Sequence, residues 1–384
     1  MKQYSHKDLS EYVKSIYKNE DVIPLHKPVF GKKEKKYVME TIESTFVSSV
    51  GSYVDLFEKK ICDIVKSKYS IATVNGTSAL HIGLKIVGVK PNELVLTQAF
   101  SFVATCNAIK YTGAEPVFVD ISKKTLGICP KSLINYLNNN TVIINNECIH
   151  KKSGKKISAC VPMHTFGHPS EINKILKICE TFNIKIVEDA AEAIGSLYKK
   201  KHLGTFGDVG IFSFNGNKTI TCGGGGIIIT NNKKLAIKAK HLTTQAKVDH
   251  KWEYFHDELG YNYRMPNINA ALGCAQLENL NQILKSKREI ASKYLKYFEN
   301  SNFEFVKEPK DSKSNFWLNA ILTNNLNERN ELLLHFSNNQ IFARPAWTLL
   351  NKLPMFESSE KDELINSKWV ADRLINIPSY PILK

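Results

Sequence analysis

The chain has 384 residues, of which 43% are hydrophobic and 23% are charged. This length suffices for two compact units, and the composition is typical of a globular protein and excludes a long disordered tail. The formal net charge is +15, yet only five of the 52 basic residues are arginines. Because base readout and bidentate phosphate contacts favour arginine, the charge indicates a solvated lysine-rich surface and no nucleic-acid partner.

No stretch reaches the ~18 apolar residues that a membrane-spanning helix needs. The N-terminal segment MKQYSHKDLSEYVKSIYK contains neither the apolar core nor the cleavage site of a secretory signal. We therefore expect a cytoplasmic protein without a membrane partner. The eight cysteines are scattered without zinc-type spacing, which predicts reduced thiols and no metal site.

Strand-like and helical segments alternate along the first half of the chain. Residues 1–20 predict an amphipathic helix, with a capping box at Ser5 and Asp8. From residue 69 onward, short β-rich runs alternate with helical stretches, which is typical of a mostly parallel sheet flanked by helices. The runs are IATV (71–74), TSALHIGLKIV (77–87), LVLT (94–97), FVATCNAIKY (102–111), PVFV (116–119) and a polar connection, then ACVPMH (159–164), EINKILKICETF (171–182) and KIVEDA (185–190).

The rest of the chain predicts a surface hairpin, a further strand and a smaller lobe. Residues 145–157 form a basic segment with a Ser-Gly turn, which predicts the hairpin. The run IIIT (227–230) predicts the strand, and a lysine-rich helix follows it. Two helical segments begin at residue 267, and short mixed elements follow from about residue 303. We divide the chain into an N-terminal helical extension (1–30), a large domain (31–266) and a smaller C-terminal domain (267–384).

Polar residues follow several predicted strands. In sheets of this kind, ligands bind beyond the carboxyl ends of the strands, where the loops gather. We therefore expect these residues to form one shared pocket. They are Asn75 to Thr77, Gln98 to Phe102, Asp120, His164 and Asp189.

One acid and one lysine indicate the chemistry. Asp189 ends an apolar run, and Lys218 lies in a polar turn between VGIFSF and the four glycines 223–226. A lysine can bind a cofactor aldehyde as a Schiff base, while a buried carboxylate keeps a pyridine nitrogen protonated. The pair therefore suggests pyridoxal phosphate (PLP). Helix N-capping by Asp189 is an equal alternative, and a P-loop is disfavoured because the pattern G-x-x-x-x-G-K-[ST] fails here.

The cofactor phosphate requires donors, and its ring requires an apolar cover. The segment NGTSALHI offers backbone amides at a helix N-terminus and the hydroxyls of Thr77 and Ser78. Ser213, five residues before Lys218, can add another hydroxyl. Phe102 can cover one face of the ring, although core packing is a credible alternative for it.

Together these segments resemble the sugar-nucleotide aminotransferases of the DegT/DnrJ/StrS type, which have the aspartate aminotransferase (type I) fold. The resemblance extends over nearly the whole chain, and the order and spacing of the motifs are more specific than any one motif. The motifs are IPLHKPVFG, VGSYVDLFE, NGTSALHIGL, AFSFVAT, AEPVFVD, VEDAAEAIGS, GTFGDVGIFSFNGNKTITCGGGG, GYNYRMPNINAALGCAQLE and ARPAW.

The resemblance implies an α/β fold with a large domain and a smaller C-terminal α/β domain. The large domain would contain a mixed, mostly parallel seven-stranded sheet flanked by helices. The resemblance also implies a PLP-dependent homodimer with shared active sites. By this likeness Lys218 is the Schiff-base lysine, Asp189 the partner of the pyridine nitrogen and Phe102 the stacking aromatic residue. The likeness also assigns phosphate binding to Thr77, Ser78 and Ser213, a phosphate contact from the partner subunit to Asn262, and a contact with the ring hydroxyl to Glu192, where many relatives carry glutamine or histidine.

The N-terminal extension and the stretch STFVSSVGSYVDLFE resemble the legionaminic acid pathway subgroup. Such enzymes move an amino group from glutamate to C4 of a nucleotide-linked 4-keto-6-deoxy-2-acetamido sugar for surface glycans. The candidate substrate contacts are His26, Ser48, Ser49, Arg264, Trp317 and Arg344. For His26 and Trp317 the alternative role is packing, and for Arg264 and Arg344 it is a structural ion pair.

Two other functions stay open. A basic DNA-binding regulator could retain the fold without the chemistry, although no helix-turn-helix with arginines on its second helix is evident. A sugar dehydratase or lyase could share the fold, but the related dehydratases carry histidine where Lys218 stands.

Overall fold

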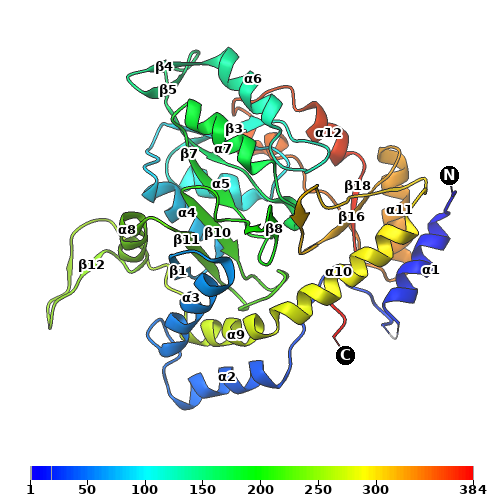
Figure 1. Cartoon of the computed structure of the whole chain (residues 1–384), viewed down its shortest axis with the longest axis horizontal. Coiled ribbons are helices and arrows are strands. Elements are labelled where there is room, and N and C mark those ends of the chain that lie inside the picture. The colour runs from blue at the N-terminus through cyan, green and yellow to red at the C-terminus, as the bar shows by residue number, and fades with distance from the viewer. Residues whose placement is uncertain (1, 19, 384) are drawn as a thin grey trace.

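The computed structural model describes residues 2–18 and 20–383 and shows a large α/β lobe beside a smaller lobe (Figure 1). The large lobe is built on a seven-stranded sheet in the order β1-β11-β10-β7-β6-β2-β3. β11 runs antiparallel to both of its neighbours, and the other pairs are parallel, so the sheet is mixed as expected. Its strands are β1 (Tyr69–Thr73), β2 (Leu94–Gln98), β3 (Glu115–Val119), β6 (Ile157–Val161), β7 (Lys185–Asp189), β10 (Val209–Ser213) and β11 (Gly226–Thr230).

Helices cover both faces of this sheet, which is why its strands are almost continuously apolar. Successive side chains of a strand point to opposite faces, so Ile71 and Ala72 of β1 belong to different core clusters. One face packs against α4, α5 and α8, and the other against α3, α9, α6 and α7. These helices are α3 (Ser52–Val65), α4 (Gly76–Ile86), α5 (Val103–Tyr111), α6 (Pro130–Asn140), α7 (Ile172–Thr181), α8 (Lys233–Thr243) and α9 (Asn267–Glu278).

The helix α6 corrects the sequence analysis, which predicted only a polar connection after β3. Its sequence PKSLINYLNNN carries few apolar residues, but Leu133, Tyr136 and Leu137 share one buried face. Pro130 occupies the first turn, where its missing N–H costs no hydrogen bond. The helix therefore forms because the sheet offers an apolar surface for it to pack on. The sequence of the segment alone does not reveal that surface.

The predicted basic hairpin is present but begins earlier than expected. The strands β4 (Thr141–Ile144) and β5 (Glu147–His150) pair antiparallel. Asn145 and Asn146 join them with positive φ values of 50° and 63°, as the tight turns of two-residue hairpins require. A second turn follows at Gly154, whose φ is 67°.

The smaller lobe contains a four-stranded sheet in the order β14-β16-β18-β17. The predicted N-terminal helix α1 (His6–Ile16) has the expected Ser5–Asp8 capping box and packs its apolar face into this lobe. Its other elements are β14 (Glu304–Phe305), β16 (Asn319–Leu322), β17 (Arg344–Pro345), β18 (Leu374–Ile377), α10 (Leu280–Tyr297), α11 (Leu326–Asn338) and α12 (Ile365–Ala371), with the short 3-10 helices η2 (Leu350–Lys352) and η3 (Pro354–Phe356).

The boundary between the lobes stays a prediction. The helix α9 packs on α2 (Lys32–Glu43) and α3, and Ala270 and Cys274 lie in the same core cluster as Phe57. This packing favours a boundary after α9 rather than before it. A three-stranded sheet then connects the lobes, because β15 (Ser312–Lys313) pairs with β8 (Leu197–Tyr198), which also pairs with β9 (Lys201–His202).

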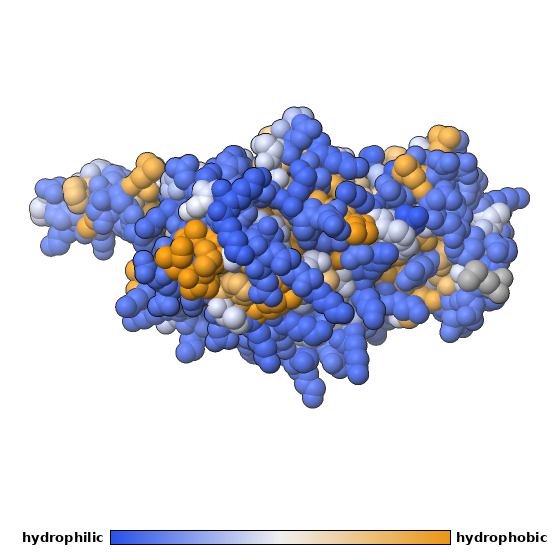
Figure 2. All heavy atoms as spheres, turned by 90° about the horizontal axis from the view of Figure 1, so that it is seen from above, coloured by the Kyte–Doolittle hydropathy of each residue, from blue (hydrophilic) through white to orange (hydrophobic). Residues whose placement is uncertain are grey.

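An arm projects from the large lobe at the left of Figures 1 and 2. It contains β12 (Lys247–Val248) and β13 (Phe255–His256) and exposes several large apolar side chains. The face seen in Figure 2 is otherwise mostly hydrophilic, with separate apolar patches. None of the helices in the described ranges is long and apolar enough to cross a membrane. The eight cysteines are free, as predicted.

Candidate active site

A cavity of about 310 Å³ lies beyond the carboxyl ends of the central strands. It forms where β7 and β10 end and where α4 and α5 begin. Residues as far apart in the chain as Asn75 and Trp347 meet here, as the sequence analysis expected for this edge of the sheet. The predicted cofactor residues that line it are Thr77, Phe102, Asp189, Glu192, Ser213 and Lys218.

Asp189 ends β7 and is held rigidly at the base of this cavity. Its side chain is 3% exposed. The hydroxyl of Thr105 donates a hydrogen bond to Oδ2 at 2.7 Å, and the N–H of Ala191 donates to Oδ1 at 3.1 Å. In the described chain a turn rather than a helix follows Asp189, which rules out the helix N-cap alternative. A buried carboxylate of this kind is costly without a cationic partner.

Lys218 enters the cavity from the turn after β10. Its backbone N–H donates to the carbonyl of Asn215, which fixes the turn. Its Nζ lies 3.3 Å from Oε1 of Glu192 and 4.0 Å from the centre of the Trp317 ring. The side chain is 12% exposed, so the amine is largely shielded from water but open to the cavity.

Glu192 is a buried carboxyl group whose proton affinity is altered by its surroundings. Burial raises its pKa to about 7, and the negative charge of Asp189 acts in the same direction. The positive charge of Lys218 and a 2.8 Å hydrogen bond from the N–H of Phe166 oppose this rise. Near neutral pH, Glu192 therefore exchanges a proton beside the amine of Lys218.

The start of α4 provides an anion-binding turn. The side chain of Asn75 caps the helix by accepting the N–H of Ser78 at 2.8 Å. The N–H groups of Gly76 and Thr77 come earlier in the first turn, so no carbonyl within the helix can accept them. Together with the positive end of the helix dipole, they suit an anion. Ser78 itself is buried with its amide already occupied, and its predicted phosphate contact stays a prediction.

Two glycines allow the strands to approach this turn closely. A Cβ at Gly76 would lie 2.9 Å from Cβ of Ser213, and a Cβ at Gly226 would lie 2.3 Å from the carbonyl oxygen of Asn75. Only glycine fits at the second position, because the obstacle is backbone. The hydroxyl of Ser213 is thereby brought beside the amides of α4.

The donor set of this cavity fits PLP. Asp189 suits a protonated ring nitrogen, Lys218 suits the aldehyde, and the turn at Thr77 with Ser213 suits the phosphate. Phe102 precedes α5 and is 50% exposed, so its ring is available to cover the cofactor.

Three of the polar residues predicted to share the pocket support the fold instead. Both carboxylate oxygens of Asp120 accept backbone N–H groups at the start of α12. His164 bonds to Glu188 at 2.9 Å, and the amide of Gln98 donates to the carbonyls of Phe100 and Leu126. The prediction of one pocket was wrong for these residues, because each is enclosed by loops or by the second lobe.

The predicted substrate residues fall into two groups. His26, Trp317 and Arg344 line a second cavity of about 460 Å³, which shares Asn217, Trp317 and Trp347 with the first. The remaining substrate candidates lie on outer loops of their own chain: Ser48 and Ser49 between α2 and α3, and Arg264 near the base of the arm. Nε of Arg264 donates to Oδ1 of Asn262, the residue predicted to contact the cofactor phosphate of the partner subunit, at 3.1 Å.

Several lining residues were missed by the sequence analysis. Thr105, which orients Asp189, lies one helical turn after Phe102 and looked like an ordinary helix residue. Asn217 precedes Lys218 directly, and its carbonyl accepts the indole N–H of Trp317 at 2.7 Å. Trp347 stands in the quoted motif ARPAW, so its position in that motif was the available signal.

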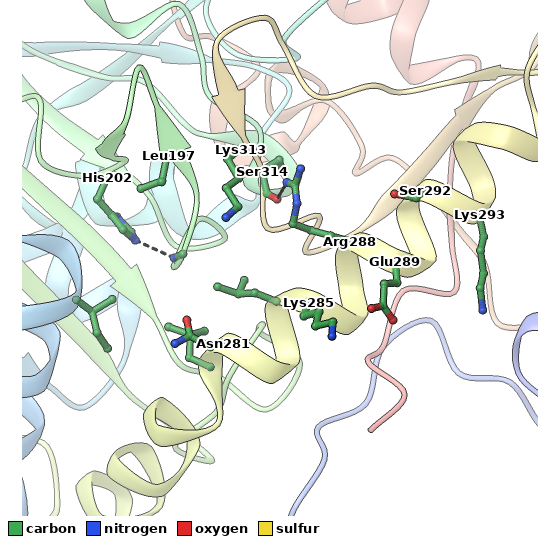
Figure 3. Close-up of a pocket in the computed structure, with 14 residues that line it drawn as sticks. Leu197, His202, Asn281, Lys285, Arg288, Glu289, Ser292, Lys293, Lys313 and Ser314 are labelled. Carbon is green, nitrogen blue, oxygen red and sulfur yellow. Dashed lines mark hydrogen bonds between the residues drawn. The ribbon is translucent and has the colours of Figure 1, made fainter. Parts of the chain in front are cut away.

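A larger cavity, of about 770 Å³, lies between α10 and the β8–β9 hairpin (Figure 3). Two of its polar groups, the side chains of His202 and Arg288, are already engaged. Nε2 of His202 accepts the N–H of Gly195 at 2.8 Å, and the guanidinium of Arg288 forms two 3.0 Å bonds with Glu308. Cavity size therefore does not locate the chemistry in this molecule.

Known proteins resemble this chain over nearly its full length. Residues 28–384 match the DegT/DnrJ/EryC1/StrS aminotransferase family. The chain is 39% identical over 361 residues to a GDP-perosamine synthase of Escherichia coli O157:H7, and 35% identical over 363 residues to one of Vibrio cholerae. Each alignment covers 94% of both chains. A crystal structure of a DegT DnrJ EryC1 StrS aminotransferase from Brucella abortus superposes with a TM-score of 0.84 at 25% identity, covering 92% of this chain and 91% of that one.

These likenesses confirm the predicted family, fold class and cofactor. They favour transamination over the dehydratase and regulator alternatives. They do not single out the legionaminic acid subgroup, since the two relatives are named for GDP-perosamine. The chain therefore belongs to the DegT/DnrJ/EryC1/StrS aminotransferase family and is a PLP-dependent aminotransferase.

Proposed function

We propose that this enzyme transfers an amino group from glutamate to C4 of a nucleotide-linked 4-keto-6-deoxy sugar. The observation that carries this proposal is the meeting of Lys218, Asp189 and the anion-binding turn of α4 in one cavity. The names of the two relatives support a GDP-linked sugar. The resemblance in residues 44–58 supports the 2-acetamido sugar of the legionaminic acid pathway, which we keep as the second substrate to test.

When bound, PLP supplies an electron sink that stabilises negative charge on the carbon that loses a proton. Residues that the cavity already orients would hold it. Asp189, fixed by Thr105 and Ala191, would accept the ring N–H. The amides of Gly76 and Thr77 would bind the phosphate at the other end.

With PLP bound, the amine of Lys218 would act as the general base and acid that moves the proton during amino transfer. The Trp317 ring, 4.0 Å from Nζ, stabilises the ammonium form, and Glu192 at 3.3 Å can accept or return a proton. The side chains of Trp317 and Trp347 also line the cavity beside these groups.

We further propose a cytoplasmic homodimer in which each cavity is completed by the partner chain. Asn262 supports this arrangement, because it lies outside the Lys218 cavity of its own chain on an exposed segment next to the projecting arm. In the dimer it would contact the cofactor phosphate of the other subunit.

Borohydride reduction tests the site, and amino transfer tests the substrate. The wild-type protein should be yellow, and reduction should attach the cofactor to the peptide that contains Lys218. Lys218→Ala should lose both the attachment and transfer from glutamate to a GDP-linked or UDP-linked 4-keto-6-deoxy sugar. Lys233→Ala, which removes a lysine at the start of the distant helix α8, serves as the control. A wild-type protein that binds no PLP, or one that turns over neither sugar with glutamate, would contradict the proposal.

A further inference from the structure

A buried asparagine joins the two lobes beside the Lys218 cavity. Asn315 lies on the link between β15 and β16 and is 0% exposed. Its Nδ2 donates hydrogen bonds to the backbone carbonyls of Glu192 and Ile194, at 2.8 and 2.9 Å. Its Oδ1 accepts the backbone N–H of Trp317 at 2.9 Å. One side chain therefore binds both a loop of the large lobe and the backbone of an aromatic residue in the cavity wall.

These partners leave the side-chain amide of Asn315 only one orientation. A carbonyl oxygen can only accept a hydrogen bond, and a backbone N–H can only donate one. An asparagine supplies a donor end and an acceptor end on one short side chain, which neither a carboxylate nor a hydrocarbon does. Removing the amide would leave two carbonyls and one N–H without this partner, and an unpaired buried polar group is costly.

The same nitrogen also approaches the turn that carries Lys218. Nδ2 of Asn315 lies 3.2 Å from Oγ1 of Thr219, the residue that follows Lys218 directly. The carbonyl of Asn217, which precedes Lys218, accepts the indole N–H of Trp317 at 2.7 Å. The residues on both sides of Lys218 are thus bound either to Asn315 or to the tryptophan that Asn315 holds.

The residues that Asn315 holds are those that face the amine of Lys218. Oε1 of Glu192 lies 3.3 Å from Nζ of Lys218, and the centre of the Trp317 ring lies 4.0 Å from it. Because Asn315 bonds to the backbone of both residues, a shift of its amide would move the carboxyl group and the indole ring together. The surroundings of the amine are therefore fixed from the smaller lobe as well as from its own turn.

The backbone around Asn315 is anchored independently of its side chain. The hydroxyl of Ser196 accepts the N–H of Asn315 at 2.9 Å, and the carbonyl of Gly167 accepts the hydroxyls of Ser196 and Ser314, at 2.8 and 3.0 Å. Gly167 makes room for this contact, because a Cβ there would lie 1.8 Å from Oδ1 of Asn315. Replacing the side chain of Asn315 should therefore leave the segment in place.

We propose that Asn315 is a positioning residue for Lys218, and that its amide places the amine against the cofactor aldehyde by holding the backbone of the residues around it. This inference rests on the proposed function, because it takes Lys218 as the residue that binds PLP. In that step the nitrogen of the neutral amine forms a C=N bond with the aldehyde carbon, and the aldehyde oxygen leaves as water with the two amine hydrogens. A misplacement of about 1 Å can slow such a reaction by about 10²-fold.

Two forms of the cofactor separate positioning from general damage. Pyridoxamine phosphate has the ring and the phosphate of PLP but no aldehyde, so it binds without forming a bond to Lys218. Its Kd for the cofactor-free protein, from calorimetric titration, reports the ring and phosphate contacts alone. The rate at which PLP becomes attached, from stopped-flow absorbance and borohydride trapping, reports the placement of the amine. Asn315→Ala should slow attachment by about tenfold or more and leave the Kd of pyridoxamine phosphate unchanged.

Asn319→Ala is the matched control. Asn319 is 1% exposed and belongs to the same lobe, and in the part of the molecule that the structure describes its side chain donates only to Oγ of Ser379, at 3.1 Å. This variant should attach PLP at the wild-type rate. Asn315→Ser keeps one hydroxyl, which can donate to only one of the two carbonyls, and should slow attachment by a smaller factor. It replaces Asn315→Ala if the alanine protein has a lowered thermal unfolding midpoint.

Two results would overturn the inference. One is attachment of PLP to Asn315→Ala at the wild-type rate. The other is an equal loss of pyridoxamine phosphate binding and of PLP attachment, because a disturbed site explains both. Neither measurement uses glutamate or a sugar. If the wild type attaches PLP at Lys218 but transfers no amino group to either sugar, the positioning role of Asn315 stands and the proposed function fails.

Discussion

At the scale of single residues, this site depends on ionisable groups that are kept out of water. Asp189, Glu192 and Lys218 lie around one small cavity, and each is held by a hydrogen bond or an aromatic contact that a surface side chain would lack. Burial makes the charge of Glu192 sensitive to its neighbours, and the pKa of this carboxyl group is raised to about 7.

The raised pKa of Glu192 predicts a pH-dependent contribution to stability. The folded protein holds this proton more tightly than the unfolded chain does, whose carboxyl has the ordinary value of 4.5. The stabilisation is therefore fully present below pH 4.5 and is lost as the pH rises through 7. Relative to Glu192→Gln, which does not titrate, the cofactor-free wild type should lose about 3 kcal/mol of unfolding free energy between pH 4.5 and pH 8.

Urea unfolding of both cofactor-free proteins at several pH values in this range measures that difference. The positive charge of Lys218 faces Glu192 in both proteins, so its own effect largely cancels in the comparison. If the unfolding free energies of the two proteins depend on pH in the same way, the pKa of Glu192 is not raised.

At the scale of elements, close packing between β11 and the start of α4 creates the anion-binding turn. Asn75 caps α4, and Gly226 begins β11 directly against its carbonyl. The strand pairs with β1 on one side and with β10 on the other, so it cannot move aside without breaking one of these ladders. The geometry of the turn is therefore set by the sheet rather than by the loop.

Gly226→Ala should disturb both the sheet and the phosphate contact. The new Cβ would meet the carbonyl oxygen of Asn75 at 2.3 Å, which forces the strand or the turn to shift. We expect a stability loss of about 1–3 kcal/mol and an affinity for PLP that is at least about tenfold weaker. Gly216→Ala is the matched control, because no heavy atom of the described chain lies within 4 Å of its added Cβ. Equal PLP affinity in the two variants would argue against a phosphate site at this turn.

At the scale of the whole molecule, two lobes enclose the site. Lys218, Asp189 and Glu192 come from the large lobe, while Trp317, Arg344 and Trp347 come from the segments that follow α10. Lys287 of α10 ties the segment around His26 to the carbonyls of Trp317 and Ser379 at the junction of the lobes. The substrate side of the pocket thus depends on how the lobes pack together.

A shared dimeric site makes a specific prediction for mixed subunits. If Asn262 serves the cavity of the partner, a dimer of Lys218→Ala with Asn262→Ala contains one cavity with both natural residues. Random reassociation of equal amounts should restore about a quarter of wild-type activity, because half of the dimers are mixed and half of their sites are intact. Amino transfer by the mixture, after unfolding and refolding together, measures the effect.

Mixing Lys218→Ala with Asp189→Ala provides the control. These two residues belong to the same cavity of one chain, so every cavity in that mixture keeps one defect and activity should stay absent. If the mixture of Lys218→Ala and Asn262→Ala shows no more amino-transfer activity than either variant alone, Asn262 does not contribute to the partner's site.

The buried strands were predictable because their signal is local. Runs such as LVLT and IIIT are apolar throughout, since both faces of the sheet are covered. The capping box at Ser5 and Asp8 was equally visible. The helix α6 was not, because its apolar face is narrow and gains its stability only from the sheet beneath it.

The sequence by itself determined the family, the fold class and the cofactor, and it named six residues that the structure brings together around one cavity. Local patterns and motif order carry that information. Only the tertiary structure decided that Asp120, His164 and Gln98 support the fold, and that Arg344, His26 and Asn376 surround one cavity. Whether a polar side chain faces a cavity or a buried partner depends on residues hundreds of positions away. Lys287 and His26, separated by 261 positions, show why no local pattern could have revealed it.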